Sequence, residues 1–277
     1  MVAQYPPISR GARPPTRFSW RLFFVLLAAA LIGVAAALPM LLQMIPQIAP
    51  PDRPSVPLPL LIILGIGQNL LLFGVAVAVG MRLAPRVGTG APIIEGWIAG
   101  ETPRDIARSL RVPLVIGLAV GIALVVIDVA IFLPRVPAAI ARLAEGIPAW
   151  KRLLAGFLYG GITEEILMRW FLLSLVVWLL ARAWRTSDGR PTSGAWWTAI
   201  VVVALLFGIG HLPTTSAITP LTSMVVVRAL VLNGIAGLTF GYLFWRSGLE
   251  AAMAAHLATH VGLQLVGPAL AARLAEP

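Results

Sequence analysis

Seven long apolar segments dominate this sequence, and each is close to the length that crosses a lipid bilayer. An α-helix needs about 20 apolar residues to span the hydrocarbon core. Backbone polar groups in lipid must be satisfied within the protein, which a single spanning segment achieves only as a helix. We therefore predict an all-α fold, a polytopic transmembrane helical bundle with about seven or eight spans. The segments lie near residues 22–45, 58–81, 112–133, 153–181, 195–212, 222–245 and 249–270.

The composition supports a membrane protein and excludes several other classes. Hydrophobic residues make up 59% of the chain and charged residues only 12%, well below the share found in soluble domains. The chain has no cysteine, which excludes disulfides, a thiol nucleophile and a thiolate metal site. The 21 basic residues outnumber the 11 acidic ones, but they lie mostly at the ends of apolar segments. That position favours a lipid bilayer as the partner and argues against nucleic acid.

The organisation along the chain is simple. Residues 1–21 are rich in proline and arginine, and we predict a disordered cytoplasmic tail. Residues 22–277 form a single predicted transmembrane domain. The first apolar run is longer than the core of a signal peptide, so we expect it to be retained as a span. The distribution of Arg and Lys between the spans predicts a cytoplasmic N-terminus and a multi-pass protein of the cell membrane.

Three charged residues lie together inside the fourth predicted span. Glu164, Glu165 and Arg169 occur in the stretch GGITEEILMRWF. Each ionised side chain costs about 2.5–3.5 kcal/mol at bilayer depth, so such a cluster needs compensating partners or a function. The four-residue spacing predicts that Glu165 and Arg169 pair on one helix face. Glu164 has no basic residue at that spacing, which makes it the candidate general base.

The three histidines of the chain lie in later predicted spans. His211 ends the fifth span, with Phe207 four residues earlier on the same face. His256 and His260 share one face of the last span, at the spacing that zinc-binding helices use. These three histidines are candidate ligands of a divalent metal such as Zn²⁺. No residue between His256 and His260 can act as the base, so Glu164 on another helix is the candidate.

The three motifs together resemble the CPBP family of intramembrane proteases, which includes the CAAX prenyl endopeptidases and bacteriocin-processing or Abi-type proteins. The family pattern is Glu-Glu-x3-Arg, then Phe-x3-His, then His-x3-Asn or His-x3-Asp. The resemblance covers residues ~150–265 and departs from the pattern at one position, where His260 replaces Asn or Asp. The residues that match are Glu164, Glu165, Arg169, Phe207, His211, His256 and His260.

The resemblance implies an intramembrane (metallo)endopeptidase that acts on a peptide or a membrane protein. In this hypothesis Glu164, helped by His211, activates a water, and His256 and His260 stabilise the oxyanion. A metal-assisted mechanism and a metal-free glutamate mechanism both stay open. Two other hypotheses are a catalytically silent scaffold or immunity protein of the same fold and a proton-coupled transporter, which would use intramembrane Glu and His as a relay.

Overall fold

The computed structural model describes residues 18–48, 57–101, 105–141 and 146–267. Within these ranges every regular element is helical, and an isolated bridge between Arg185 and Pro191 is the exception. The predicted all-α fold is confirmed. The predicted N-terminal tail lies outside the described residues up to position 17, and the first helix begins at Trp20.

The first half of the chain forms two long helices, a short one and a third long one. The third long helix continues through a π-helical and a 3₁₀ turn. In chain order the elements are α1 (Trp20–Ile48), α2 (Leu58–Val87), α3 (Pro92–Ile98), α4 (Ile106–Ile127), η1 (Asp128–Phe132), η2 (Leu133–Arg135) and α5 (Ala138–Ala141).

The second half begins with one continuous helix from Ala149 to Leu180, in which α-helical ends flank a π-helical middle. Its parts are α6 (Ala149–Leu154), η4 (Ala155–Glu164), η5 (Ile166–Leu173) and α7 (Ser174–Leu180). The remaining elements are α8 (Ser193–Gly210), α9 (Leu212–Ser216), α10 (Ser223–Ser247), α11 (Leu249–Val261) and η6 (Gly262–Val266).

Five helices in the described residues are long and apolar enough to cross a membrane, which agrees with a multi-pass membrane protein. They are Trp20–Met44, Leu60–Val87, Ile106–Arg135, Ser193–Ser216 and Ser223–Ser247. Within the other two predicted spans, 153–181 and 249–270, the described residues form the helices Ala149–Leu180 and Leu249–Val266. They fall outside this group because they carry the Glu, Arg and His residues of the three motifs.

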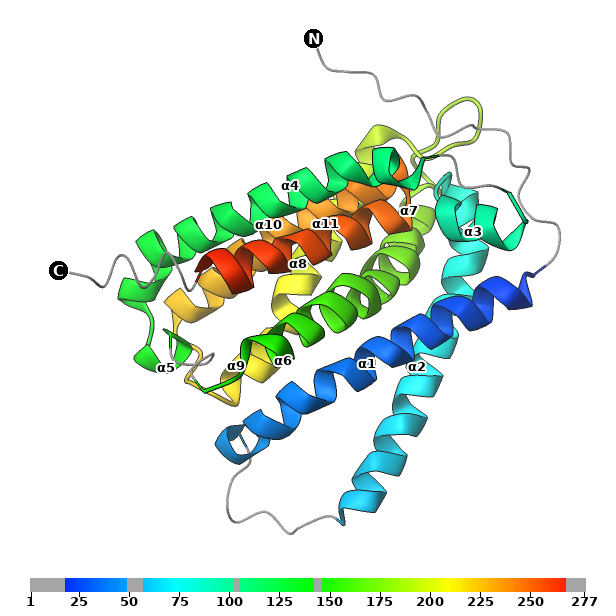
Figure 1. Cartoon of the computed structure of the whole chain (residues 1–277). Helices are drawn as coiled ribbons and strands as arrows, with labels where there is room; N and C mark the ends of the chain where they lie inside the picture. Colours follow the sequence, from blue (N-terminus) through cyan, green and yellow to red (C-terminus); the bar gives the residue numbers. More distant parts are fainter. Residues whose placement is uncertain (1–17, 49–56, 102–104, 142–145, 268–277) are drawn as a thin grey trace.

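The helix Ala149–Leu180 is the centre of the bundle. The helix α1 packs against η4, α2 packs against η5, and α11 packs against η4. Figure 1 shows α4 running alongside α11, with α8 and α10 behind them. Gly117 lets α4 approach α11 closely, because it has no side chain. A Cβ atom at this position would lie 2.0 Å from the Ala255 carbonyl oxygen.

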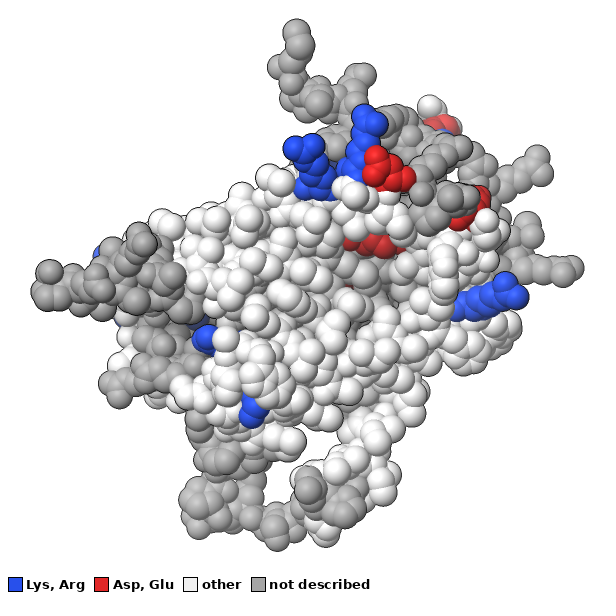
Figure 2. Space-filling view, viewed as in Figure 1, with Lys and Arg blue, Asp and Glu red and all other residues white. Residues whose placement is uncertain are grey.

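The outer surface is suited to lipid over most of its area. Figure 2 shows a broad, mostly uncharged belt with Lys, Arg, Asp and Glu toward the ends of the bundle. Large apolar side chains in the belt are exposed, and Leu71 is 71% exposed. In a bilayer these side chains face hydrocarbon, so their exposure to the surroundings is favourable.

The short helix α3 fixes the end of α11 that precedes the histidines. Glu250 Oε1 accepts hydrogen bonds from the backbone N–H of Ile93 at 3.0 Å and of Ile94 at 2.8 Å. The Leu249 N–H donates to the Gly90 carbonyl at 2.9 Å. These bonds satisfy free N–H groups at the start of α3 and hold the start of α11.

Candidate active site

The helix turns that carry Glu164 and Glu165 are wound more widely than an α-helix. The π-helical segments η4 and η5 lie on either side of Glu165. The Thr163 hydroxyl, buried beside them, donates to the Ala30 carbonyl of α1 at 2.9 Å. π-helical turns are rare and occur frequently at functional sites. The sequence predicted ordinary α-helix here, and that prediction was wrong because nothing in the local residue pattern marks the wider winding.

Glu165 and Arg169 form the predicted ion pair within this helix. Arg169 Nη1 lies 3.1 Å from Glu165 Oε1, and both side chains are buried. Arg169 Nη2 also donates to the Gly237 carbonyl of α10 at 3.3 Å. The guanidinium therefore compensates one of the two carboxylates and ties the central helix to α10.

His256 of α11 lies between the two glutamates. Its Nδ1 donates to Glu165 Oε1 at 2.7 Å, and its Nε2 lies 4.0 Å from Glu164 Oε2. The shorter bond fixes the orientation of the imidazole ring, which leaves Nε2 directed at Glu164. Glu164 keeps 20% of its side chain exposed, whereas Glu165 has none exposed. The contact between Glu165 and His256 was not among the predictions from the sequence.

Two phenylalanines close the site on the sides of α8 and α10. Phe240 stacks on His256 with ring centroids 4.5 Å apart. The Arg169 guanidinium carbon lies 5.2 Å from the centroid of the Phe207 ring and 5.4 Å from that of the Phe240 ring. Such cation–π contacts stabilise a guanidinium that has left water. Phe240 was not among the predicted site residues. Its signal in the sequence was weak, because one more aromatic residue in an apolar span is ordinary.

His211 lies at the end of α8, and the predicted packing of Phe207 beside it is confirmed. The two ring centroids are 4.8 Å apart in an edge-to-face arrangement. His211 Nδ1 donates to the Phe207 carbonyl at 2.7 Å, which leaves Nε2 with the lone pair. No hydrogen bond or ion pair joins His211 to Glu164 within the described ranges. The imidazole beside Glu164 is therefore that of His256.

His260 stacks face to face on His256, as its spacing on one helix face predicted. The ring centroids are 5.1 Å apart and the planes differ by 12°. Gly156 and Gly160 of the central helix form the seat of this ring. A Cβ atom at either glycine would lie 2.6 Å from a His260 ring nitrogen, closer than real contacts allow. His260 Nδ1 is buried and has no hydrogen-bond partner among the described residues.

The predicted three-histidine metal site stays a prediction. A metal ligand must offer an unprotonated nitrogen or a carboxylate oxygen directed at a shared point. His256 and His211 each use Nδ1 to donate a hydrogen bond, which leaves Nε2 of each ring as the nitrogen that could bind an ion. In the described part of the chain no three His, Asp or Glu side chains are grouped to hold one ion. No step proposed below depends on a metal.

Residues 146–262 match the protein-family model described as Type II CAAX prenyl endopeptidase Rce1-like. This match agrees with the resemblance to the CPBP/CAAX protease family. The matched range includes all seven predicted site residues. No curated protein and no solved structure matches the chain.

The match supports a CAAX-type intramembrane protease at the level of the family. The structure brings together Glu164, Glu165, Arg169 and His256, with Phe207 and His260 in contact with the same group. His211 joins through Phe207. The predicted site residues come from the central helix, α8 and α11, and α10 adds Phe240.

Proposed function

We propose that this protein is an intramembrane endopeptidase in which Glu164 activates a water for attack on a peptide carbonyl. The observation that carries the proposal is the 4.0 Å separation of Glu164 Oε2 and His256 Nε2. This separation is too long for a direct hydrogen bond. It is short enough for one water or one carbonyl oxygen to contact both groups.

The charges of the cluster support a protonated His256. Glu164 and Glu165 carry two negative charges, and Arg169 carries one positive charge. A proton on both nitrogens of His256 brings the sum to zero, which a poorly solvated site favours. Nδ1–H then donates to Glu165, and Nε2–H points to the space in front of Glu164.

The reaction follows from these positions. Glu164 takes a proton from the water while the water oxygen bonds to the peptide carbonyl carbon. His256 Nε2–H donates to the carbonyl oxygen as it becomes negative, which lowers the energy of the tetrahedral intermediate. Glu164 then gives its proton to the amide nitrogen, and the C–N bond breaks to yield a carboxylic acid and an amine.

The remaining residues act on this pair. Glu165 and Arg169 position His256, because they hold its Nδ1 and neutralise each other. His260 supports the His256 ring from the opposite side to Phe240. His211 Nε2 can accept a hydrogen bond from the water or from the substrate. The N-terminus is proposed to be cytoplasmic and the membrane to be the cell membrane, as the distribution of basic residues predicts.

Peptide cleavage by the purified full-length protein in liposomes tests the proposal. The probes are internally quenched peptides with a farnesylated cysteine four residues from the C-terminus, and matched peptides without the lipid. We expect wild-type protein to cleave at least one set and Glu164→Gln to lower the rate at least about 10²–10⁴-fold. Glu101→Gln, at an exposed glutamate outside the spans, is the matched control. An unchanged rate in Glu164→Gln would overturn the proposed role of this carboxylate.

The same assay separates the alternative functions. Cleavage confined to the farnesylated set assigns a CAAX-type substrate, and equal cleavage of both sets assigns a general membrane peptidase. If wild-type protein cleaves no peptide, a catalytically silent scaffold or immunity protein becomes the better hypothesis. Proton flux across the liposomes, measured with a pH dye, would instead favour the transporter.

A further inference from the structure

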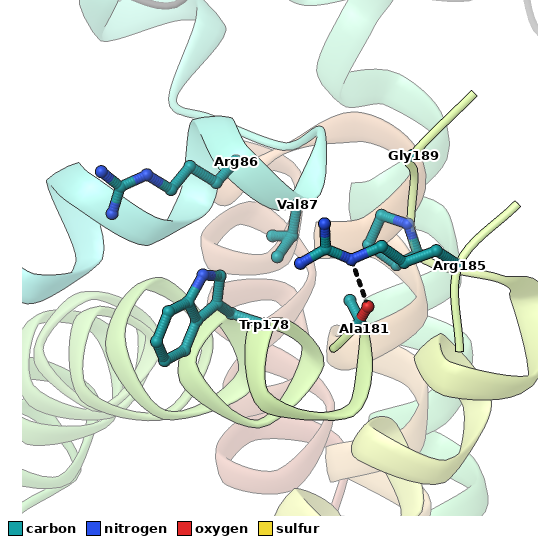
Figure 3. A pocket seen from close by; sticks show the side chains of 7 residues that line it. Arg86, Val87, Trp178, Ala181, Arg185 and Gly189 are labelled. Atoms are coloured by element: carbon teal, nitrogen blue, oxygen red, sulfur yellow. Dashed lines mark hydrogen bonds between the residues drawn. The ribbon is translucent and has the colours of Figure 1, made fainter. Parts of the chain in front are cut away.

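A second site lies away from the Glu and His residues, at one end of the bundle. It is a pocket of about 230 Å³ between the end of α2, the end of α7 and the hairpin that leads to α8 (Figure 3). The residues that line it are Arg86, Val87, Trp178, Ala181, Arg185, Gly189 and Pro191. Basic, aromatic and apolar side chains thus meet in one cavity.

This end of the molecule has the composition of a membrane–water interface. The second span ends at Val87, directly beside the pocket. Two tryptophans at this end are about half exposed, Trp184 at 46% and Trp197 at 47%. Exposed tryptophan and arginine at the end of spans are typical of the headgroup layer. The pocket therefore opens where phospholipid headgroups lie.

The walls of the pocket suit a phosphate group. Arg185 donates from Nε to the Ala181 carbonyl, and Figure 3 shows its guanidinium turned over the pocket. Arg86 lies in the last turn of α2 and lines the pocket, and Figure 3 shows its guanidinium directed away from Arg185. The Arg182 guanidinium lies 4.2 Å from the Trp178 ring, so a third arginine contacts a residue that lines the pocket. Arginine binds phosphate oxygens in a bidentate manner, and its charge attracts anionic lipids.

A separate apolar groove lies on the same two helices, closer to the middle of the membrane. Its volume is about 350 Å³, and it lies between α2 and Phe171 of the central helix. At 100° per residue, one face of α2 carries two groove residues and one pocket residue, since Gln68, Val75 and Arg86 lie within about 20° of each other around the helix axis. Val75 is about 16 Å from Arg86 along the axis, close to the roughly 15 Å of one leaflet. The groove residues are Gln68, Leu71, Leu72, Val75, Ala76 and Phe171.

We propose that the pocket and the groove together bind one anionic phospholipid. The phosphate is held by Arg185 beside the Trp178 ring, the Arg86 side chain turns toward it when the lipid binds, and an acyl chain lies along Val75 and Phe171. A hydrophilic phosphate compound would use only the pocket, whereas a lipid uses both features. The pocket and the groove both lie between α2 and the central helix, so one lipid molecule fits them better than a small phosphate compound does.

Lipid retention by the full-length protein tests this site. The protein is released from nanodiscs of equal phosphatidylglycerol and phosphatidylcholine with identical acyl chains, and retained lipids are counted by native mass spectrometry. We expect preferential retention of phosphatidylglycerol. The double variant Arg86→Gln/Arg185→Gln should lower this preference about thirtyfold, about fivefold for each arginine. Val75→Trp should lower retention by filling the groove, at a position that is half exposed and tolerant of change.

Two controls decide whether the site is specific. Arg246→Gln removes one positive charge at the same end of the bundle, at a residue that contacts Trp245 and does not line the pocket, and it is compared with the single variant Arg185→Gln. It should leave the preference unchanged, and a loss equal to that of Arg185→Gln would mean that only diffuse charge matters. Glycerol 3-phosphate should compete poorly with the lipid. Equal competition would overturn the lipid proposal in favour of a soluble phosphate ligand.

Discussion

One oxygen of Glu165 serves both Arg169 and His256. Arg169 Nη1 lies 3.1 Å from Glu165 Oε1, and His256 Nδ1 donates to the same oxygen at 2.7 Å. One buried oxygen therefore links the helix that carries the two glutamates to the helix that carries His256. The pair within one helix is also the support of the contact between two helices.

Loss of Arg169 should destabilise the fold more than loss of an exposed arginine. In Arg169→Met the Glu165 charge is left buried without its guanidinium, which should lower the free energy of unfolding by about 3–5 kcal/mol. Arg190→Gln is the control, since its pair with Asp188 is exposed and should contribute about 0–1 kcal/mol. Unfolding curves in detergent with added dodecyl sulfate measure both.

A double variant separates charge from packing. Glu165→Gln/Arg169→Met removes both charges, so the unfolding free energy should recover much of the loss seen in Arg169→Met. Peptide cleavage should remain lost in the double variant because His256 is no longer held by a carboxylate. Equal instability of the single and double variants would mean that packing of Arg169, rather than its charge, is what the fold needs.

The seat of His260 should tolerate no added carbon. Gly160→Ala places a Cβ atom 2.6 Å from His260 Nε2 and 3.3 Å from His256 Nε2, so both rings must move. We expect a loss of about 1–3 kcal/mol in unfolding free energy and slower cleavage. Gly234→Ala is the control, since no atom lies within 4 Å of its added carbon. The smaller side chain in His260→Asn should restore stability to Gly160→Ala, and failure to do so would contradict the proposed seat.

Another ion pair joins η1, which continues α4, to the first turns of α10. Arg228 donates from Nε to Asp128 Oδ1 at 2.7 Å and from Nη2 to Asp128 Oδ2 at 2.6 Å. The pair is about four-fifths buried, so a double-mutant cycle with Asp128→Asn and Arg228→Gln should give a coupling of about 1–3 kcal/mol. Additive losses would mean that the two side chains do not support each other in the membrane.

Removal of divalent metals should leave cleavage unchanged. No three His, Asp or Glu side chains are grouped to hold one ion among the described residues, and the proposed steps use only Glu164 and His256. Cleavage rates before and after dialysis against a chelator, with Zn²⁺ added back as the control, measure this. A rate that falls with the chelator and returns with Zn²⁺ would show that the site rearranges around an ion, as the sequence spacing of the histidines suggested.

Contacts within one helix were predictable from the sequence because they depend only on residue spacing. The pairing of Glu165 with Arg169, the shared face of His256 and His260, and the packing of Phe207 on His211 all follow from four-residue separations. The spans followed in the same way from the length of the apolar runs, and the family motifs identified the region that carries the chemistry.

Contacts between helices were decided by the tertiary structure. The sequence assigned His211 to Glu164, but the fold places His256 there, because the packing of α11 on the wide turns of the central helix sets which ring arrives. Phe240, the glycine seat of His260 and the Asp128–Arg228 pair depend on helices up to about a hundred residues apart. Residue spacing determines which side chains share one face of a helix. The winding of the helix and its packing against neighbouring helices determine which other side chains that face contacts.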